Sequence, residues 1–111
     1  MRTKPCLTLE DCRTITDAAI VEAKKNKWNV TICITDDGGH TLLLTRMDGC
    51  APVAKDRIAA GRVALLRMPP LPVQGGVPIM VQGECVGAVG VSGVQSHEDE
   101  QVCNAGIAAL Q

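Results

Sequence analysis

Arg46 and Asp48 are the residues whose types and spacing most suggest a binding site in this 111-residue sequence. They follow an apolar segment and precede Gly49, so we expect them where a strand ends and the chain turns. An arginine at a strand end can bind a carboxylate or another anionic group through two parallel hydrogen bonds. The sequence equally allows Arg46 to pair with Asp48 or with another subunit, and this alternative stays open.

Glycine-containing segments elsewhere could complete such a site. The segments Gly61–Arg62 and Gly75–Gly76 would supply backbone N–H donors around the same anionic group, although turn geometry alone would also require glycine there. The predicted ligand-binding residues are therefore Arg46, Asp48, Gly49, Arg62, Gly75 and Gly76.

The two histidines are the other candidates for chemistry. His40 is expected at the start of a strand beside Asp36 and Asp37, where it could act as a general base or join a carboxylate in binding a divalent metal. His97 is expected in the first turn of the last helix, and either imidazole could ligate an iron. The simpler interpretations are an exposed strand end for His40, a helix start for His97 and turn chemistry for the aspartates.

The remaining reactive side chains give weaker signals. The six cysteines are scattered without a CxxC pair, and we expect most of them to be small buried residues, with Cys50 as the loop thiol most exposed to reaction. Ser92 lacks the GxSxG elbow of a serine hydrolase. The glycines at 87, 90 and 93 do not have the spacing of a dinucleotide-binding turn and are expected to serve close packing.

Composition excludes several classes of partner. Eleven basic and twelve acidic residues give a formal charge of −1, and the chain has a single aromatic residue, so we expect no nucleic-acid partner. No apolar run approaches the roughly 20 residues that cross a bilayer. We therefore expect a cytoplasmic protein without a membrane partner.

Periodicity and capping signals predict the elements that must position these residues. Apolar residues at helical spacing behind Thr8 predict a helix over residues 8–26, and a period of two predicts a hairpin of strands 30–35 and 40–46. A short helix followed by a strand is expected in 55–68, then a hairpin of strands 77–81 and 84–92, and a helix from Ser96. This order predicts a single α+β domain spanning residues 1–111.

Several segments in this order resemble the GlcG/HbpS-like family, also called the haem-degrading domain or domain of unknown function 336, which includes the C-terminal domain of some cobalamin adenosyltransferases. The matching segments are residues 36–39, 46–49, 75–79, 87–93 and 98–100. The resemblance implies an antiparallel sheet of about five strands, with N- and C-terminal helices packed on it and a profilin-like outline. It also implies a homo-oligomer and, in some members, binding of haem or a corrinoid.

The resemblance fails at one place. Family members carry a long helix after the Met-Asp-Gly loop, whereas here residues 47–54 lead directly to residues that resemble a later segment. A helix is therefore expected to be missing between about residues 54 and 55.

These observations favour a small-ligand-binding protein for haem or another tetrapyrrole, a corrinoid or a small carboxylate, more than an enzyme. Two alternatives are kept. One is an enzyme or accessory protein in small hydroxy-acid or diol metabolism, with His40 or an acidic residue as general base. The other is a structural or regulatory module without a ligand.

Overall fold

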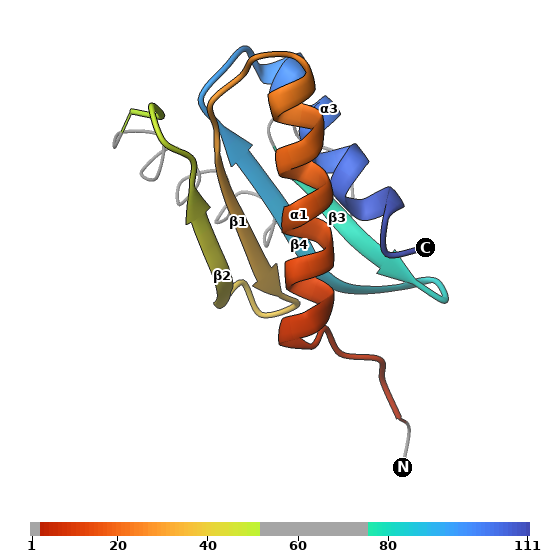
Figure 1. Ribbon diagram of the computed structural model, residues 1–111. Helices are drawn as coiled ribbons and strands as arrows, with labels where there is room; N and C mark the ends of the chain where they lie inside the picture. The colour runs from red at the N-terminus through yellow and green to blue at the C-terminus, as the bar shows by residue number, and fades with distance from the viewer. Residues whose placement is uncertain (1–2, 52–75) are drawn as a thin grey trace.

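Two helices pack on one face of a four-stranded antiparallel sheet in the computed structural model, which describes residues 3–51 and 76–111 (Figure 1). The elements are α1 (Leu9–Lys25), β1 (Thr31–Asp36), β2 (Thr41–Arg46), β3 (Gly76–Val81), β4 (Glu84–Ser92) and α3 (Ser96–Ala108). The expected α+β architecture is confirmed. The fifth strand that we expected lies in residues 55–68, outside the described residues, as does the expected break near residue 54.

Local signals explain where the helices begin. Thr8 caps α1, because its Oγ1 accepts a hydrogen bond from the Asp11 N–H while the Asp11 carboxylate accepts one from the Thr8 N–H. The sequence suggested Ser96 as the cap of the last helix, but Ser96 is already the first residue of α3. Its N-cap is Gln95, whose N–H donates to the carboxylate of Glu98.

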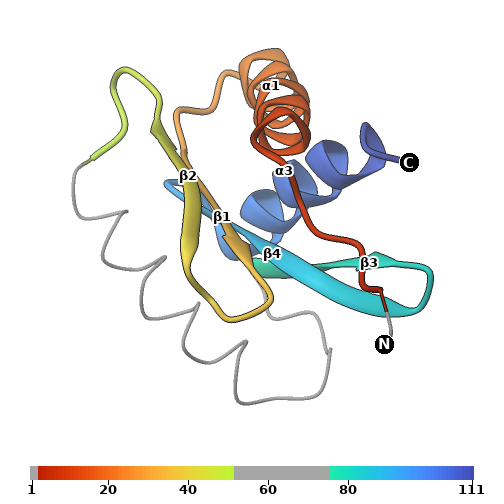
Figure 2. The same cartoon turned by 90° about the horizontal axis from the view of Figure 1, so that it is seen from below.

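The sheet has the order β2-β1-β4-β3, so β1 and β4 form its centre and join the two hairpins. Ile32 and Ile34 on β1 lie opposite Val91 and Val89 on β4. These side chains belong to a buried core that includes residues of α1 and α3, and Figure 2 shows both helices on this face. Alternate residues of each strand consequently point away from the helices.

Gly87 allows the two central strands, β1 and β4, to approach each other very closely. A Cβ atom added to Gly87 would lie 2.1 Å from the carbonyl oxygen of Thr35 and 2.8 Å from a methyl carbon of Leu7. Leu7 packs against the core from the segment before α1. Gly87 therefore serves close packing, as the sequence predicted. Neither described helix is long and apolar enough to cross a membrane.

Candidate functional site

Arg46, Asp48 and Gly49 lie together where β2 ends. The N–H of Cys50 donates to the carbonyl oxygen of Met47, which closes a turn over Asp48 and Gly49. Gly49 has φ +85°, as the third residue of a type II turn requires. The N–H of Met47 also donates to the Val30 carbonyl, so this turn is attached to the start of β1.

The register places Arg46 on the sheet face away from the helices. Arg46 lies opposite Thr31, and Thr31 lies opposite Ser92 on β4. Residues directly opposite one another in a sheet point to the same face. For these three residues it is the face opposite to Ile32, which points toward the helices. Thr31 and Ser92 are buried, whereas Arg46 and Asp48 are exposed. The guanidinium is therefore accessible at the margin of this face.

Within residues 3–51 and 76–111, Arg46 forms no ion pair or hydrogen bond through its side chain, and neither does Asp48. The alternative that Arg46 pairs with Asp48 of the same chain is therefore wrong for the structure described. An exposed guanidinium that none of the described residues neutralises has its donors available for an anion.

The other predicted ligand-binding residues are only partly placed. Gly76 begins β3 and pairs with Gly90, which pairs in turn with Cys33 on β1. It thus lies at the same end of the sheet as Arg46, but three strand spacings away, or about 14 Å. Arg62 and Gly75 lie outside the described residues.

Asn29, Thr31 and Cys50 surround the turn, and the sequence did not predict that Asn29 or Thr31 would lie there. The amide of Asn29 lies beside Gly49, since a Cβ atom on Gly49 would be 2.9 Å from the Asn29 Nδ2. The Cys50 Sγ lies 3.2 Å from the Thr31 Oγ1. Asn29 belongs to the connection before β1, and no local sequence pattern indicates its proximity to Gly49.

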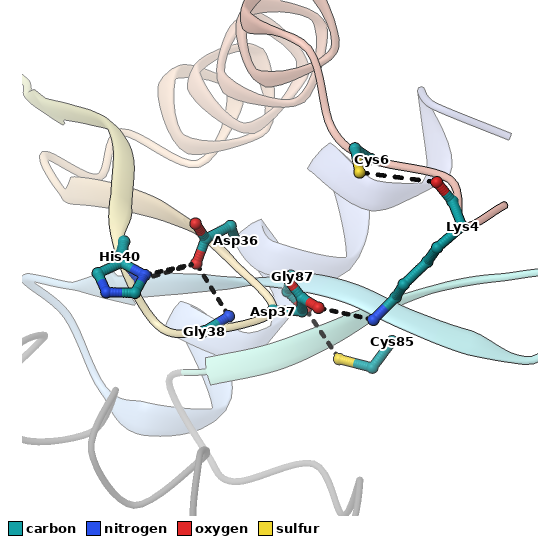
Figure 3. A network of polar contacts seen from close by, with 8 residues as sticks. All are labelled: Lys4, Cys6, Asp36, Asp37, Gly38, His40, Cys85 and Gly87. Carbon is teal, nitrogen blue, oxygen red and sulfur yellow. Dashed lines mark hydrogen bonds and ion pairs between the residues drawn. The ribbon is translucent and has the colours of Figure 1, made fainter. Parts of the chain in front are cut away.

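The expectation that Cys50 is the reactive loop thiol is not supported, because Cys50 is buried with 8% of its surface exposed. Four of the six cysteines are buried, as expected, but Cys6 and Cys85 are exposed. The Cys85 Sγ donates to the Gly87 carbonyl, and the Cys6 Sγ donates to the Lys4 carbonyl (Figure 3).

His40 and Asp36 lie at the opposite end of β2 from Arg46. The Asp36 Oδ1 accepts hydrogen bonds of 2.9 Å from the N–H groups of Gly38 and His40, and lies 3.4 Å from the His40 Nδ1 (Figure 3). These donors, first that of His40, lower the pKa of Asp36 below its ordinary value. Asp36 therefore has the turn-forming role of the simpler interpretation.

Of the metal candidates, the structure brings together only Asp36 and His40. The His40 side chain is 83% exposed, and His97 is exposed in the first turn of α3. The described residues contain no group of three or more His, Cys, Asp or Glu side chains that could hold a metal ion.

An open surface hollow of about 580 Å³ lies at the His40 end of the sheet and is lined by Thr3, Lys4, Asp37, Glu84 and Cys85. The Lys4 Nζ donates to the Asp37 carboxylate at 2.6 Å. This contact raises the pKa of Lys4 and lowers the pKa of Asp37. The Lys4 cation of the hollow is thus already neutralised, and the hollow is not lined by Arg46, Asp48, Gly49 or Gly76, the predicted ligand-binding residues that the structure describes.

Comparison with known proteins gives one family. The model of the family described as haem degrading protein HbpS-like matches residues 7–68 and 58–108. Protein GlcG of Escherichia coli K12 is 42% identical over 114 aligned residues, which cover 83% of this chain and 85% of the relative.

Solved structures have the same fold. A double mutant of Streptomyces reticuli HbpS is 27% identical, with a TM-score of 0.82, over 100% of this chain and 91% of that one. The complex of PduOC with haem has a TM-score of 0.76 at 20% identity, and 95% of each chain is covered. At that identity the likeness to PduOC shows the fold alone.

Proposed function

The chain belongs to the HbpS-like family of haem-degrading proteins, and from that premise we propose that it is a binding protein for an anionic tetrapyrrole such as haem. A corrinoid or a small carboxylate would use the same anion-binding end of β2. We propose further that the protein acts as a homo-oligomer and that binding, more than catalysis, is its role.

The observation that carries the proposal is the exposed guanidinium of Arg46. It has no partner within the described residues and stands beside the Asp48–Gly49 turn. A haem propionate or a small carboxylate would accept two parallel hydrogen bonds from it. The Asn29 amide beside Gly49 is a further donor that could reach the same carboxylate.

The other predicted residues have supporting roles in this proposal. Gly76 and its pairing partner Gly90 carry no side chains, so Gly76 would contribute through its backbone N–H. Arg62 and Gly75 would add a second cation and a backbone donor. The family description supports a tetrapyrrole as the ligand.

Titration of the purified protein with haemin, followed by visible absorbance, tests the proposal. We expect a saturable shift of the Soret band. Arg46→Ala should weaken binding about 10- to 100-fold, because charge-assisted hydrogen bonds contribute about 1.5–3 kcal/mol. Arg46→Lys should bind less tightly than wild type, since lysine cannot form the bidentate contact.

The matched control is Arg13→Ala, which removes an exposed cation from α1 and should bind like wild type. Equal binding by Arg46→Ala and wild type would contradict the proposed role of Arg46. A wild-type protein without any saturable Soret shift would remove the tetrapyrrole as ligand.

We also propose that the chain lacks a helix that its relatives have between about residues 54 and 55. The alignment with GlcG supports this proposal. It has 114 positions, which is more than the whole 111-residue chain, yet it covers only 83% of this chain. GlcG therefore has residues within the aligned range that have no counterpart here. The intact mass of the purified protein is the test. A mass near 11.7 kDa is expected, whereas a mass heavier by a helix-sized segment would contradict the deletion.

A further inference from the structure

The sequence contains two Asp–Gly dipeptides, Asp37–Gly38 and Asp48–Gly49, and no Asn–Gly. An aspartate followed by glycine is prone to a reaction within the chain, because glycine has no Cβ atom to hinder its backbone nitrogen. That nitrogen can attack the side-chain carboxyl carbon of the aspartate and close a five-membered succinimide ring. Both dipeptides lie in exposed turns, so exposure does not distinguish them.

Both reacting groups of Asp37–Gly38 are engaged in hydrogen bonds (Figure 3). The Gly38 N–H donates to the Asp36 Oδ1 at 2.9 Å, and the Asp37 carboxylate accepts from the Lys4 Nζ at 2.6 Å. The hydrogen bond from Lys4 also lowers the pKa of Asp37, and an ionised carboxylate is a poorer electrophile than a carboxyl group. Ring closure at this dipeptide therefore has to break both contacts.

Neither reacting group of Asp48–Gly49 is engaged within residues 3–51 and 76–111. The Asp48 side chain is exposed and forms no hydrogen bond or ion pair there, and the Gly49 N–H has no acceptor among these residues. The turn is held by the hydrogen bond from the Cys50 N–H to the Met47 carbonyl. Type I and type II turns share this hydrogen bond and differ in the orientation of the central peptide, so the peptide between Asp48 and Gly49 can rotate while the turn stays closed.

We propose that Asp48–Gly49 is a site of spontaneous isomerisation in the native protein, and that Asp37–Gly38 is protected from the same reaction. The Gly49 nitrogen forms a bond to the Asp48 Cγ, and the carboxyl hydroxyl leaves with the amide proton as water. Water then opens the succinimide at either carbonyl. Cleavage of the bond between the nitrogen and Cγ restores aspartate, whereas cleavage of the bond between the nitrogen and the main-chain carbonyl carbon leaves isoaspartate. The only co-reactant is water, which is released and then taken up.

Isoaspartate would change the candidate site without changing its formal charge. The backbone then runs through the former side chain, which lengthens the turn by one methylene group and leaves the carboxylate on a shorter branch. The hydrogen bond between Met47 and Cys50 would have to span this extra atom, so the turn beside Arg46 cannot keep its four-residue geometry. The isomerised protein should therefore bind haemin more weakly. This consequence rests on the proposed function, whereas the isomerisation does not.

Peptide mapping of stored protein tests the site. Native wild type is kept at neutral pH and physiological temperature in heavy-oxygen water, and its peptides are analysed by electron-based fragmentation, which distinguishes isoaspartate from aspartate. Isoaspartate that carries heavy oxygen should accumulate at Asp48 about 10- to 100-fold faster than at Asp37, because a charge-assisted hydrogen bond has to break before Asp37 reacts.

Two kinds of control show whether the fold sets this difference. In the urea-unfolded chain both dipeptides should react at similar rates, since neither is then held by hydrogen bonds. In the native protein Lys4→Ala should speed the reaction at Asp37, whose carboxylate it releases. Asp48→Glu should leave position 48 unmodified, because glutamate would have to close a six-membered ring. Equal native rates at the two dipeptides, or native wild type without isoaspartate at position 48, overturns the proposal.

Haemin titration before and after storage tests the consequence separately. The fraction of wild-type sites with the original affinity should fall in proportion to the isoaspartate at position 48. Asp48→Glu, compared with its own fresh sample, should show no such fall. Unchanged binding by isomerised protein overturns the loss of binding but not the isomerisation. Fresh wild type that does not bind haemin overturns the proposed ligand and the loss of binding together, and the peptide map then decides the isomerisation alone.

Discussion

Gly87→Ala should destabilise the fold through a single methyl group at the centre of the sheet. The added Cβ would lie 2.1 Å from the Thr35 carbonyl oxygen, far inside van der Waals contact, and 2.8 Å from Leu7. Because the first obstacle is backbone of the adjacent strand β1, a rotamer change cannot relieve it. Either the β1–β4 pairing or the segment that carries Leu7 must move.

The cost follows from two opposing effects. Overpacking costs about 1–3 kcal/mol, and backbone contact favours the upper part of that range. Alanine also restricts the unfolded chain, which returns about 0.4–1 kcal/mol. We expect the free energy of unfolding to fall by about 2 kcal/mol, which corresponds to a decrease in Tm of about 8 °C or more for a domain of this size.

Thermal and urea unfolding at a fixed protein concentration measure this loss. The control is Gly83→Asn at the β3–β4 turn, where a Cβ would meet no atom within 4 Å and φ is +78°. Asparagine tolerates that conformation, so this variant should remain within about 0.5 kcal/mol of wild type. A Gly87→Ala protein as stable as Gly83→Asn would refute the steric reasoning.

Three further predictions concern the rest of the molecule. The lowered pKa of Asp37 means that its contact with Lys4 stabilises the fold above the ordinary aspartate pKa, and that this stabilisation is lost as pH falls through the pKa of Asp37 in the folded protein. The Tm of Asp37→Asn should therefore fall less between pH 6 and pH 3 than the Tm of wild type, and an equal fall would contradict this. Ellman's reagent should modify Cys6 and Cys85 quickly in the native protein and the four buried thiols only on unfolding; more than two fast thiols would disagree with the structure. Thr8→Ala should lower the free energy of unfolding by about 1 kcal/mol in urea titrations, and no loss would show that the capping box does not hold the start of α1.

Local interactions made much of the fold predictable. The capping box of α1 and the Gln82–Gly83 turn depend on residues within a few positions of each other, and both were indicated by the sequence. The adjacency of β1 and β4 depends on partners more than 50 residues apart, which no period in the sequence reports. The burial of Cys50 has the same origin, because its contact with Thr31 is made only when β1 reaches the turn after β2.

Only the local part of the candidate site was predictable from the sequence. Arg46, Asp48 and Gly49 are neighbours in sequence, and one turn keeps them together in the fold. His40 is nearly as close in sequence, yet extended backbone carries it to the other end of the sheet, so closeness along a strand does not create a site.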